Sequence, residues 1–420
     1  MVVVAIWSLS LGINLPGLAV TPIEGDLHTI FHGFSDFKVQ LLTVLPNLVI
    51  IPFVLLSGRL SMTRHKISVI AAGVAIYVLS GVLYLFSKSL DGLIWISCLL
   101  GAGCGLMLPF TTGLIADVFT GKYKLRQMGI VSAIGNIALV AATFAVGFLA
   151  NINWHLPFLV YVLPIVSLIL LPWFKKIPKS DMNLDEDGNP VGSTAAQTDS
   201  AERLTVPADD DAGFSTAGQK VVGGFYIGRT IWTLLAYFFF VFATSVPAYY
   251  LPNLDGIDAE RASIITSCIY FAMFIIGITL NSVLKVFKSC SFIMAGALLL
   301  VGFAFFAFAH TEALYIVAAS LVGFGQGIAQ PLFFDKATEI CVNNSHATLS
   351  MAYLQVANYV AIAIVPLIVE LFAWMFHVDK TQATTHFPFV MNLAMMAVVF
   401  VFIVLRVKHF TFGVHKSYYE

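Results

Sequence analysis

Long apolar stretches separated by short polar connections run along most of the chain. Each stretch spans about 20–27 residues, which is enough to cross about 30 Å of hydrocarbon as an α-helix. Glycine and proline are frequent within the stretches, and membrane helices tolerate them because neighbouring helices satisfy the freed backbone groups. The pattern predicts twelve helices, over residues 2–22, 38–57, 67–87, 92–116, 127–150, 155–174, 224–250, 262–284, 290–309, 313–334, 348–372 and 387–406.

One polar segment, residues 176–222, separates the sixth predicted helix from the seventh. Asp and Glu recur there among Gly, Ser, Thr and Pro, and such a composition cannot bury enough apolar surface to order itself. We interpret the segment as a flexible acidic linker. It divides the chain into two six-helix bundles, residues 1–175 and 223–408, and residues 409–420 follow as a tail.

Composition supports a protein embedded in the lipid bilayer. Of its 420 residues, 59% are apolar and 11% are charged, and the mean hydropathy is +0.90. Soluble chains are about 45–50% apolar and about 25% charged, so these values exclude an ordinary soluble enzyme. The chain carries no basic stretch and has a net charge of −1, which argues against a nucleic-acid partner.

The motifs of common catalytic sites are missing from the sequence. No HExxH, G-x-S-x-G or phosphate-binding glycine loop with lysine occurs outside the apolar stretches. Five scattered cysteines form no CxxC pair, so neither a disulfide framework nor a metal site is predicted. The sequence therefore indicates a protein that is not an enzyme and needs no cofactor.

The distribution of cations predicts the orientation of the chain. Twelve helices with both ends on one side place 18 of the 22 Lys and Arg residues on that side. Positive charge collects on the cytoplasmic side of membrane proteins. We therefore expect a multi-pass protein of the plasma membrane whose two termini, linker and tail are cytoplasmic.

An internal repeat relates the two bundles. Two of its positions carry a central amide, Asn136 and Asn358, and two carry an acid, Asp117 and Glu339. An offset of 222 residues also superimposes Gly101, Gly103, Gly105 and Pro109 on Gly323, Gly325, Gly327 and Pro331. We interpret these matches as a duplicated six-helix unit. Parallel repeats of this kind place a binding site near the middle of the membrane, between the halves.

Two local motifs resemble those of a known family. The stretch Gly147–Ala150 followed by Trp154–Phe158 is similar to the G-x-L-A and W-x-x-P-F run of the bacterial drug-exporter-like branch of the major facilitator superfamily. The loop Gly58–Lys66 resembles the family's G-x-L-A-D-R-x-G-R-K signature, but Met62 stands at its acidic position and His65 at its second glycine.

The resemblance implies an all-α membrane protein of twelve transmembrane helices in two pseudo-symmetric six-helix bundles. It further implies a secondary active transporter that works by alternating access. Exporters of this branch carry a G-P-x-x-G-G bend in the fifth helix, whereas residues 141–147 contain no proline. The direction of transport therefore stays open, with export favoured.

The resemblance also implies a latch at the cytoplasmic side, in which the loop after the second helix pairs with an acid at the end of the fourth. Asp117 is suitably placed, with Arg59 as its best partner and Arg64 nearby. Glu339 occupies the equivalent place in the second half, where Lys336 stands three positions earlier on the same face. The alternative for Asp117 is a carboxylate that is simply solvated.

Uncharged polar side chains are the best candidates for a substrate cavity. Asn136 and Asn358 lie at mid-depth of the fifth and eleventh predicted helices, Gln326 of the tenth and Asn14 of the first, while Tyr237 lies within the seventh. Amides are costly at such depth unless paired, so hydrogen bonding between helices, or packing for Tyr237, is the alternative. A cavity without central charge suits a small amphipathic or neutral organic molecule.

Proton coupling needs an acid whose environment favours its neutral form. Glu370 lies late in the eleventh helix, and Glu24 and Asp26 follow the first helix. All three are candidates, with anchoring at the membrane interface as the alternative.

The leading hypothesis is a monomeric, proton-coupled exporter of an amphipathic solute. An uptake or exchange carrier for organic anions, such as bile-salt-like amphiphiles, is the first alternative. A polytopic membrane enzyme and a sensor that does not transport are remote alternatives.

Overall fold

The computed structural model describes residues 2–13, 15–16, 18–20, 36–62, 66–119, 121–150, 152–174, 219–254, 257, 259–342, 346–379, 382, 384–405 and 409–419. Among the predicted features, Asn14, Glu24, Asp26 and Arg64, together with most of the acidic linker, lie outside these residues.

Each of the six segments predicted in the first half contains a helix, but in the first segment, predicted over residues 2–22, the described helix ends at Gly12. The sixth segment is broken into short pieces because Pro157, Pro164 and Pro172 recur along it, and proline removes a helical hydrogen bond. The elements are α1 (Val2–Ser8), η1 (Leu9–Gly12), α3 (Asp36–Leu60), α4 (Lys66–Phe86), α5 (Leu90–Val118), α6 (Gly121–Ala150), η3 (Leu156–Val162), α7 (Ile165–Ile169) and α8 (Leu171–Phe174).

The second half repeats this order of helices. Its elements are α9 (Ile227–Tyr250), η4 (Leu251–Asn253), α10 (Ala259–Phe287), η5 (Lys288–Cys290), α11 (Ser291–Phe308), α12 (Glu312–Thr338), α13 (Ala347–Met375), α15 (Phe387–Val404), α16 (His409–Phe412) and η7 (Lys416–Tyr418). The predicted all-α membrane fold is confirmed.

A small hairpin that the sequence did not predict precedes α9. Strand β1 (Val221–Val222) pairs antiparallel with β2 (Phe225–Tyr226). Gly223 and Gly224 turn between the strands with φ of 60° and 84°, values that glycine adopts without steric cost. The Tyr226 amide donates to the Ile340 carbonyl at 2.9 Å, so the hairpin is fastened to the chain just beyond α12.

Helix length and composition agree with a multi-pass membrane protein. Within the described residues, eight helical segments are long and apolar enough to cross a membrane, and one of them, Arg261–Phe308, contains both α10 and α11. Shorter apolar helices cover Val3–Gly12, Val44–Leu60 and Leu156–Ile169. Large apolar side chains such as Trp95 and Trp374 are each 75% exposed, as side chains that face lipid would be.

The duplicated glycines make the same helix contacts in both halves. A Cβ at Gly105 would lie 2.7 Å from the Ile50 carbonyl oxygen of α3, and one at Gly103 would lie 2.5 Å from the Tyr77 amide nitrogen of α4. In the second half, Gly327 faces α10 in the same way and Gly325 faces α11. Small residues thus let α5 and α12 each pack closely between two neighbours.

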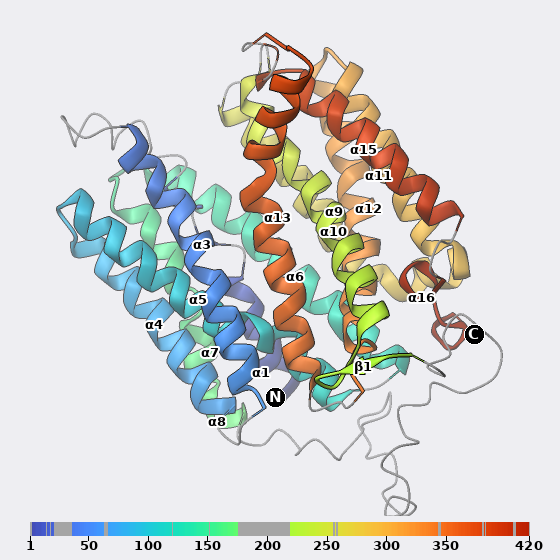
Figure 1. Cartoon of the computed structure of the whole chain (residues 1–420). Helices are drawn as coiled ribbons and strands as arrows, with labels where there is room; N and C mark the ends of the chain where they lie inside the picture. The colour runs from blue at the N-terminus through green and yellow to red at the C-terminus, as the bar shows by residue number, and fades with distance from the viewer. Residues whose placement is uncertain are drawn as a thin grey trace, which may run out of the picture.

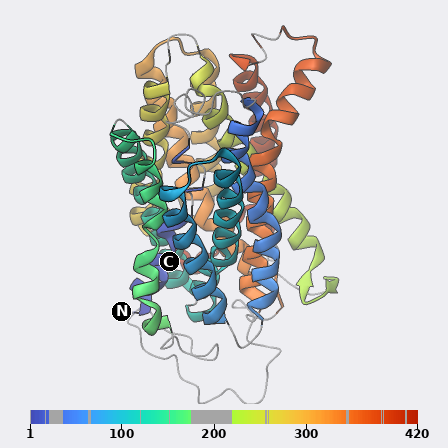
Figure 2. The same cartoon turned by 90° about the vertical axis from the view of Figure 1, so that its left-hand side faces the viewer.

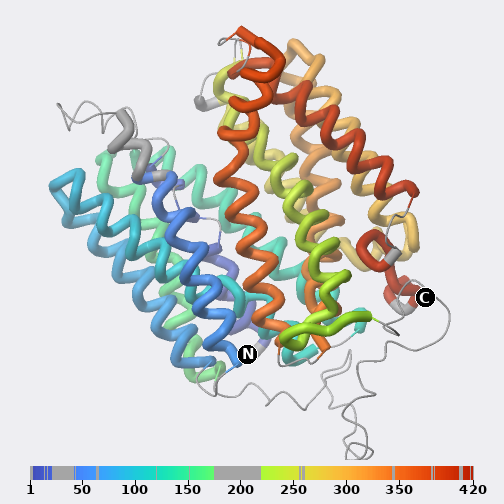
Figure 3. Tube along the Cα trace, viewed as in Figure 1, coloured from blue at the N-terminus to red at the C-terminus, as the bar shows by residue number. Residues whose placement is uncertain are grey.

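The two halves lie side by side and meet most closely at one end (Figures 1 and 2). We call this the basal end: it is where α5 and α12 stop, where α6 and α13 begin, and where residues 409–419 lie. The opposite end is the distal end. The Cα trace shows the helices of the two halves diverging toward the distal end, while both ends of the chain lie toward the basal end (Figure 3). Helices α6 and α10, and α3 and α13, pack across the boundary.

Close packing at Gly103 predicts a measurable cost for a single methyl group. Gly103→Ala places that group against α4 backbone, which cannot move aside, and overpacking of this kind costs about 1–3 kcal/mol. Gly147→Ala is the matched control, since a Cβ there meets nothing within 4 Å. Thermal unfolding in detergent should show a lower midpoint for Gly103→Ala than for Gly147→Ala. Equal midpoints would contradict this account of the packing.

Candidate functional site

A row of hydrogen bonds joins the two halves near the middle of the helices. The Asn136 amide donates to the Ser132 hydroxyl at 3.4 Å, and both residues belong to α6. The Ser132 hydroxyl in turn donates to the Gln330 side-chain oxygen of α12 at 3.3 Å. This path crosses from the first half of the chain to the second.

The row continues within the second half. Gln330 also lies close to Tyr237 of α9, and the Tyr237 hydroxyl donates to the Asn358 side-chain oxygen of α13 at 3.4 Å. We call the five residues Asn136, Ser132, Gln330, Tyr237 and Asn358 the central polar chain. They come from four helices, and none of them carries a charge.

The structure thus brings together three of the five residues predicted to line a cavity. Asn136, Asn358 and Tyr237 belong to the central polar chain, whereas Gln326 is half-buried and makes no hydrogen bond in the described structure. Ser132 and Gln330 were not predicted. The sequence did contain a signal for Gln330, which follows Gln326 by one helical turn within the apolar middle of α12.

Phenol groups lie next to this chain of hydrogen bonds. Tyr359, which follows Asn358, donates to the Ile13 carbonyl of the first half at 3.5 Å. The Tyr77 hydroxyl is fully buried and has no hydrogen-bond partner among the described residues, although buried polar groups are nearly always paired. The centre of the molecule therefore combines amides, hydroxyls and aromatic rings.

Asp117 is held at the basal end by a partner that the sequence did not favour. Lys66, the first residue of α4, places its Nζ 2.8 Å from Asp117 Oδ2. Thr348 of α13 donates to the same oxygen at 3.4 Å and reaches it from the other half. The predicted partner Arg59 is exposed near the end of α3, so the interpretation of Arg59 as the best partner was wrong. Helix α4 packs directly along α5, which brings Lys66 to the acid.

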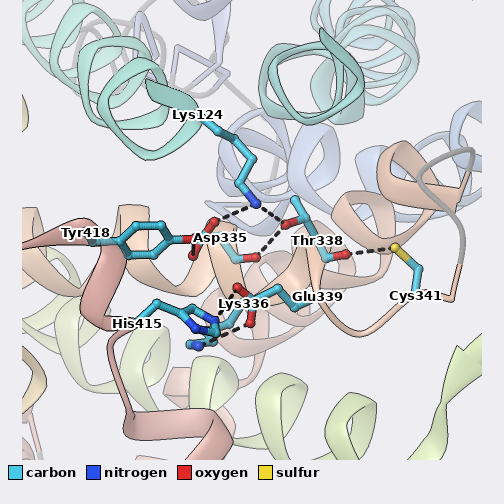
Figure 4. A network of polar contacts seen from close by, with 8 residues as sticks. All are labelled: Lys124, Asp335, Lys336, Thr338, Glu339, Cys341, His415 and Tyr418. Atoms are coloured by element: carbon cyan, nitrogen blue, oxygen red, sulfur yellow. Dashed lines mark hydrogen bonds and ion pairs between the residues drawn. The ribbon is translucent and has the colours of Figure 1, made fainter. Parts of the chain in front are cut away.

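Unlike the Lys66–Asp117 pair, another ion pair of the basal end crosses between the halves (Figure 4). Lys124 Nζ of α6 lies 2.7 Å from Asp335 Oδ1 of α12 and donates to the Thr338 hydroxyl at 2.8 Å. The Asp335 side chain is 1% exposed. Its other oxygen accepts a hydrogen bond from the Tyr418 hydroxyl at 2.8 Å. Sequence spacing gave no signal for this pair, because its members lie 211 positions apart.

Glu339 is enclosed by basic side chains of its own half. Lys336 lies 3.2 Å away, as the spacing of three residues predicts, and His415 Nε2 lies 2.9 Å away. Burial opposes ionisation of this carboxyl, but Lys336 and His415 outweigh it and hold the pKa of Glu339 well below its usual range. Lys288, the repeat equivalent of Lys66, is exposed instead. The two halves therefore bind their equivalent acids with different partners.

The remaining candidate for proton coupling lies away from the centre. Glu370 is exposed in the last turns of α13, near Tyr250 at the distal end. Within the described residues, no three His, Cys, Asp or Glu side chains converge as metal ligands would.

Comparison with known proteins assigns the family. The family model described as Major Facilitator Superfamily matches residues 2–366. The chain belongs to the major facilitator superfamily. This family and the long apolar helices agree with the predicted multi-pass membrane protein.

Two curated relatives are named for drug resistance or drug transport. The chain is 27% identical over 155 residues to the multidrug transporter protein MdtP of Bacillus subtilis, which covers 36% of this chain and 27% of that protein. It is 28% identical over 114 residues to the quinolone resistance protein NorA of Staphylococcus aureus, covering 27% of this chain and 29% of that protein. The matches thus span less than a third of either relative.

Solved structures share the fold over nearly the whole chain. The human organic anion transporter MFSD10 (TETRAN) superimposes with a TM-score of 0.67 at 15% identity, covering 95% of this chain and 98% of that one. The proton:xylose symporter XylE gives a TM-score of 0.70 at 15% identity and covers 97% and 95%. At this identity the likeness concerns the fold alone.

The Lys66–Asp117 pair predicts a difference between two neighbouring cations. Lys66→Gln leaves a buried carboxylate without its counter-ion, a loss worth about 1–3 kcal/mol. Arg59→Gln removes an exposed cation and should leave the unfolding temperature of the transporter unchanged. Thermal unfolding of the two purified variants checks this. If Arg59→Gln lowered the unfolding temperature more than Lys66→Gln, Arg59 would be the partner of Asp117, as the sequence predicted.

Proposed function

We propose that this transporter moves a small amphipathic organic solute across the plasma membrane, and that the central polar chain forms its binding site. The observation that carries the proposal is that this uncharged row of side chains joins the two halves near mid-helix. A site shared by both halves is where alternating access places a substrate. Amides and hydroxyls next to aromatic rings suit a solute with a large apolar body and few polar groups.

The orientation proposed for the chain makes the basal end cytoplasmic. It rests on the 18 of 22 Lys and Arg residues that collect on that side. The basal end is where Lys124–Asp335 and Asp117–Thr348 join the halves. In this orientation, these contacts hold the two halves together at the cytoplasmic side.

Export coupled to protons is the subtype we favour. The two relatives named for drug transport or resistance, MdtP and NorA, support a solute of that class. Glu370 is the described candidate for coupling, and its exposure near the distal end gives it access to protons from outside. Glu24 and Asp26 remain candidates on sequence grounds.

An organic-anion carrier, the alternative function, would need positively charged side chains in its binding site. Carboxylates and sulfates are bound best by Arg or Lys in paired hydrogen bonds, and the central polar chain has neither. Transport assays with both a cationic dye and a bile salt therefore separate the two candidates.

Removing a central amide should weaken substrate binding without unfolding the protein. Asn136→Ala and Asn358→Ala each lose one hydrogen-bonding group, worth about 0.5–1.5 kcal/mol, so KM for a transported dye should rise about two- to tenfold. Thr143→Ala on α6 is the control, because among the described residues its hydroxyl donates to the Leu139 carbonyl one turn away. Uptake and efflux in proteoliposomes measure KM. Wild-type KM in both Asn variants would make them packing groups.

Neutralising Glu370 should affect proton-driven transport but not the exchange of solute for solute. Glu370→Gln removes the proton-binding group, so flux driven by an imposed pH gradient should be lost while exchange of solute for solute continues. Glu312→Gln is the control, since Glu312 is also an exposed carboxylate of the distal end, where it pairs with Arg261 at 3.6 Å. If Glu370→Gln retains both activities at the level of the control, Glu370 has no coupling role.

A further inference from the structure

The C-terminal segment, residues 409–419, is packed into the basal end and does not extend freely from it. Phe410, Phe412, Val414 and Tyr418 are each no more than 8% exposed, and His415 is 8% exposed. Phe412 sets its ring against Phe292 of α11, with centroids 6.0 Å apart. The sequence had predicted only a tail here.

Cations fasten the beginning of this segment. The Arg229 guanidinium lies 4.1 Å from the centroid of the Phe410 ring, and Lys336 Nζ lies 4.9 Å from the same centroid. Cation–π contacts of this kind are attractive, and they strengthen as they become shielded from water. Helices α9 and α12 therefore both hold Phe410.

The end of the segment reaches the two buried acids of α12. Tyr418 donates to Asp335 Oδ2, and His415 contacts Glu339 (Figure 4). Burial raises the pKa of Tyr418 well above its usual value, and the nearby Asp335 and Glu339 charges raise it further, so the phenol stays protonated and remains a donor. Both acids are thus contacted by the C-terminal segment.

Asp335 divides its two oxygens between this segment and the other half of the molecule. Oδ2 accepts from Tyr418, while Oδ1 faces Lys124 of α6. A bond to Oδ2 restricts rotation of the carboxylate and keeps Oδ1 directed at Lys124. Without the phenol, Oδ2 would be a buried acceptor with no partner, and the carboxylate would have to turn or attract water.

We propose that Tyr418 and His415 are positioning residues for closure of the basal end: they orient Asp335 and Glu339 so that Lys124 of the opposite half can dock, and the C-terminal segment thereby favours the basally closed state. The inference rests on the proposed alternating access. Its consequence is that the C-terminal segment shifts the equilibrium between the two states without touching the substrate site.

Distances between spin labels on the two halves test this directly. One label pair at Arg59 and Val286 reports the basal end, and a second at Lys88 and Ala313 reports the distal end, all at exposed positions, with the native cysteines replaced. Tyr418→Phe should lengthen the basal distances and shorten the distal ones in a larger fraction of molecules, without substrate present. Tyr123→Phe is the matched control, since Tyr123 is a half-buried basal tyrosine whose ring packs on Phe119.

Lys124→Met provides the second arm of the experiment. Because Tyr418 is proposed to act through the Asp335–Lys124 pair, the shift in the double variant should equal that of Lys124→Met alone, whereas independent effects would add. His415→Gln should shift the equilibrium in the same direction. A Tyr418→Phe protein that unfolds at lower temperature but keeps the wild-type distance distribution would show a purely structural role and overturn the proposal.

The same distances distinguish a failure of the role proposed for the C-terminal segment from a failure of alternating access. If transported dye shifts the wild-type distances but Tyr418→Phe does not, alternating access stands and the role of the C-terminal segment fails. If neither dye nor any variant moves the distances, alternating access itself fails. Additive shifts in the double variant would overturn the action through Lys124.

Discussion

Buried carboxylates impose the strongest constraint on this molecule, because an unpaired charge away from water costs several kcal/mol. Asp117, Asp335 and Glu339 are all enclosed at the basal end, and each has a cation within 3.2 Å. For Asp335 that cation comes from the other half of the chain. At Asp335, the ion pair that neutralises the buried acid therefore also holds the two halves together.

Close helix packing explains why the halves can act as units. The glycines of α5 and α12 bring each helix against two neighbours at backbone distance, and contacts of that kind deform little. The described polar contacts between the halves lie at the basal end or at the centre. Ser132–Gln330 is one of the central contacts. Two stiff bundles joined by a limited set of polar contacts can rotate against each other by exchanging those contacts.

Most of the fold could be read in advance, and the candidate site only in outline. Hydrophobic length located each helix, and the 222-residue repeat paired the halves. Asn136, Asn358 and Tyr237 were recognised because polar groups stand out in apolar helices. The sequence analysis chose Gln326 and missed Gln330. The two residues lie one turn apart on the same helix, and sequence spacing alone does not show which of them faces the neighbouring polar side chains.

Local chemistry specified which groups would need partners: the acids at the ends of α5 and α12, and the amides at mid-helix. Which residues became their partners depended on how the helices pack in the tertiary structure. Lys66 replaced Arg59 because α4 lies along α5, and Lys124 meets Asp335 only because α6 crosses to the second half. Tyr418 completes the cluster because the chain folds back after α15. Such choices depend on positions that lie far apart in the chain and become neighbours only when the helices assemble, so no local pattern encodes them.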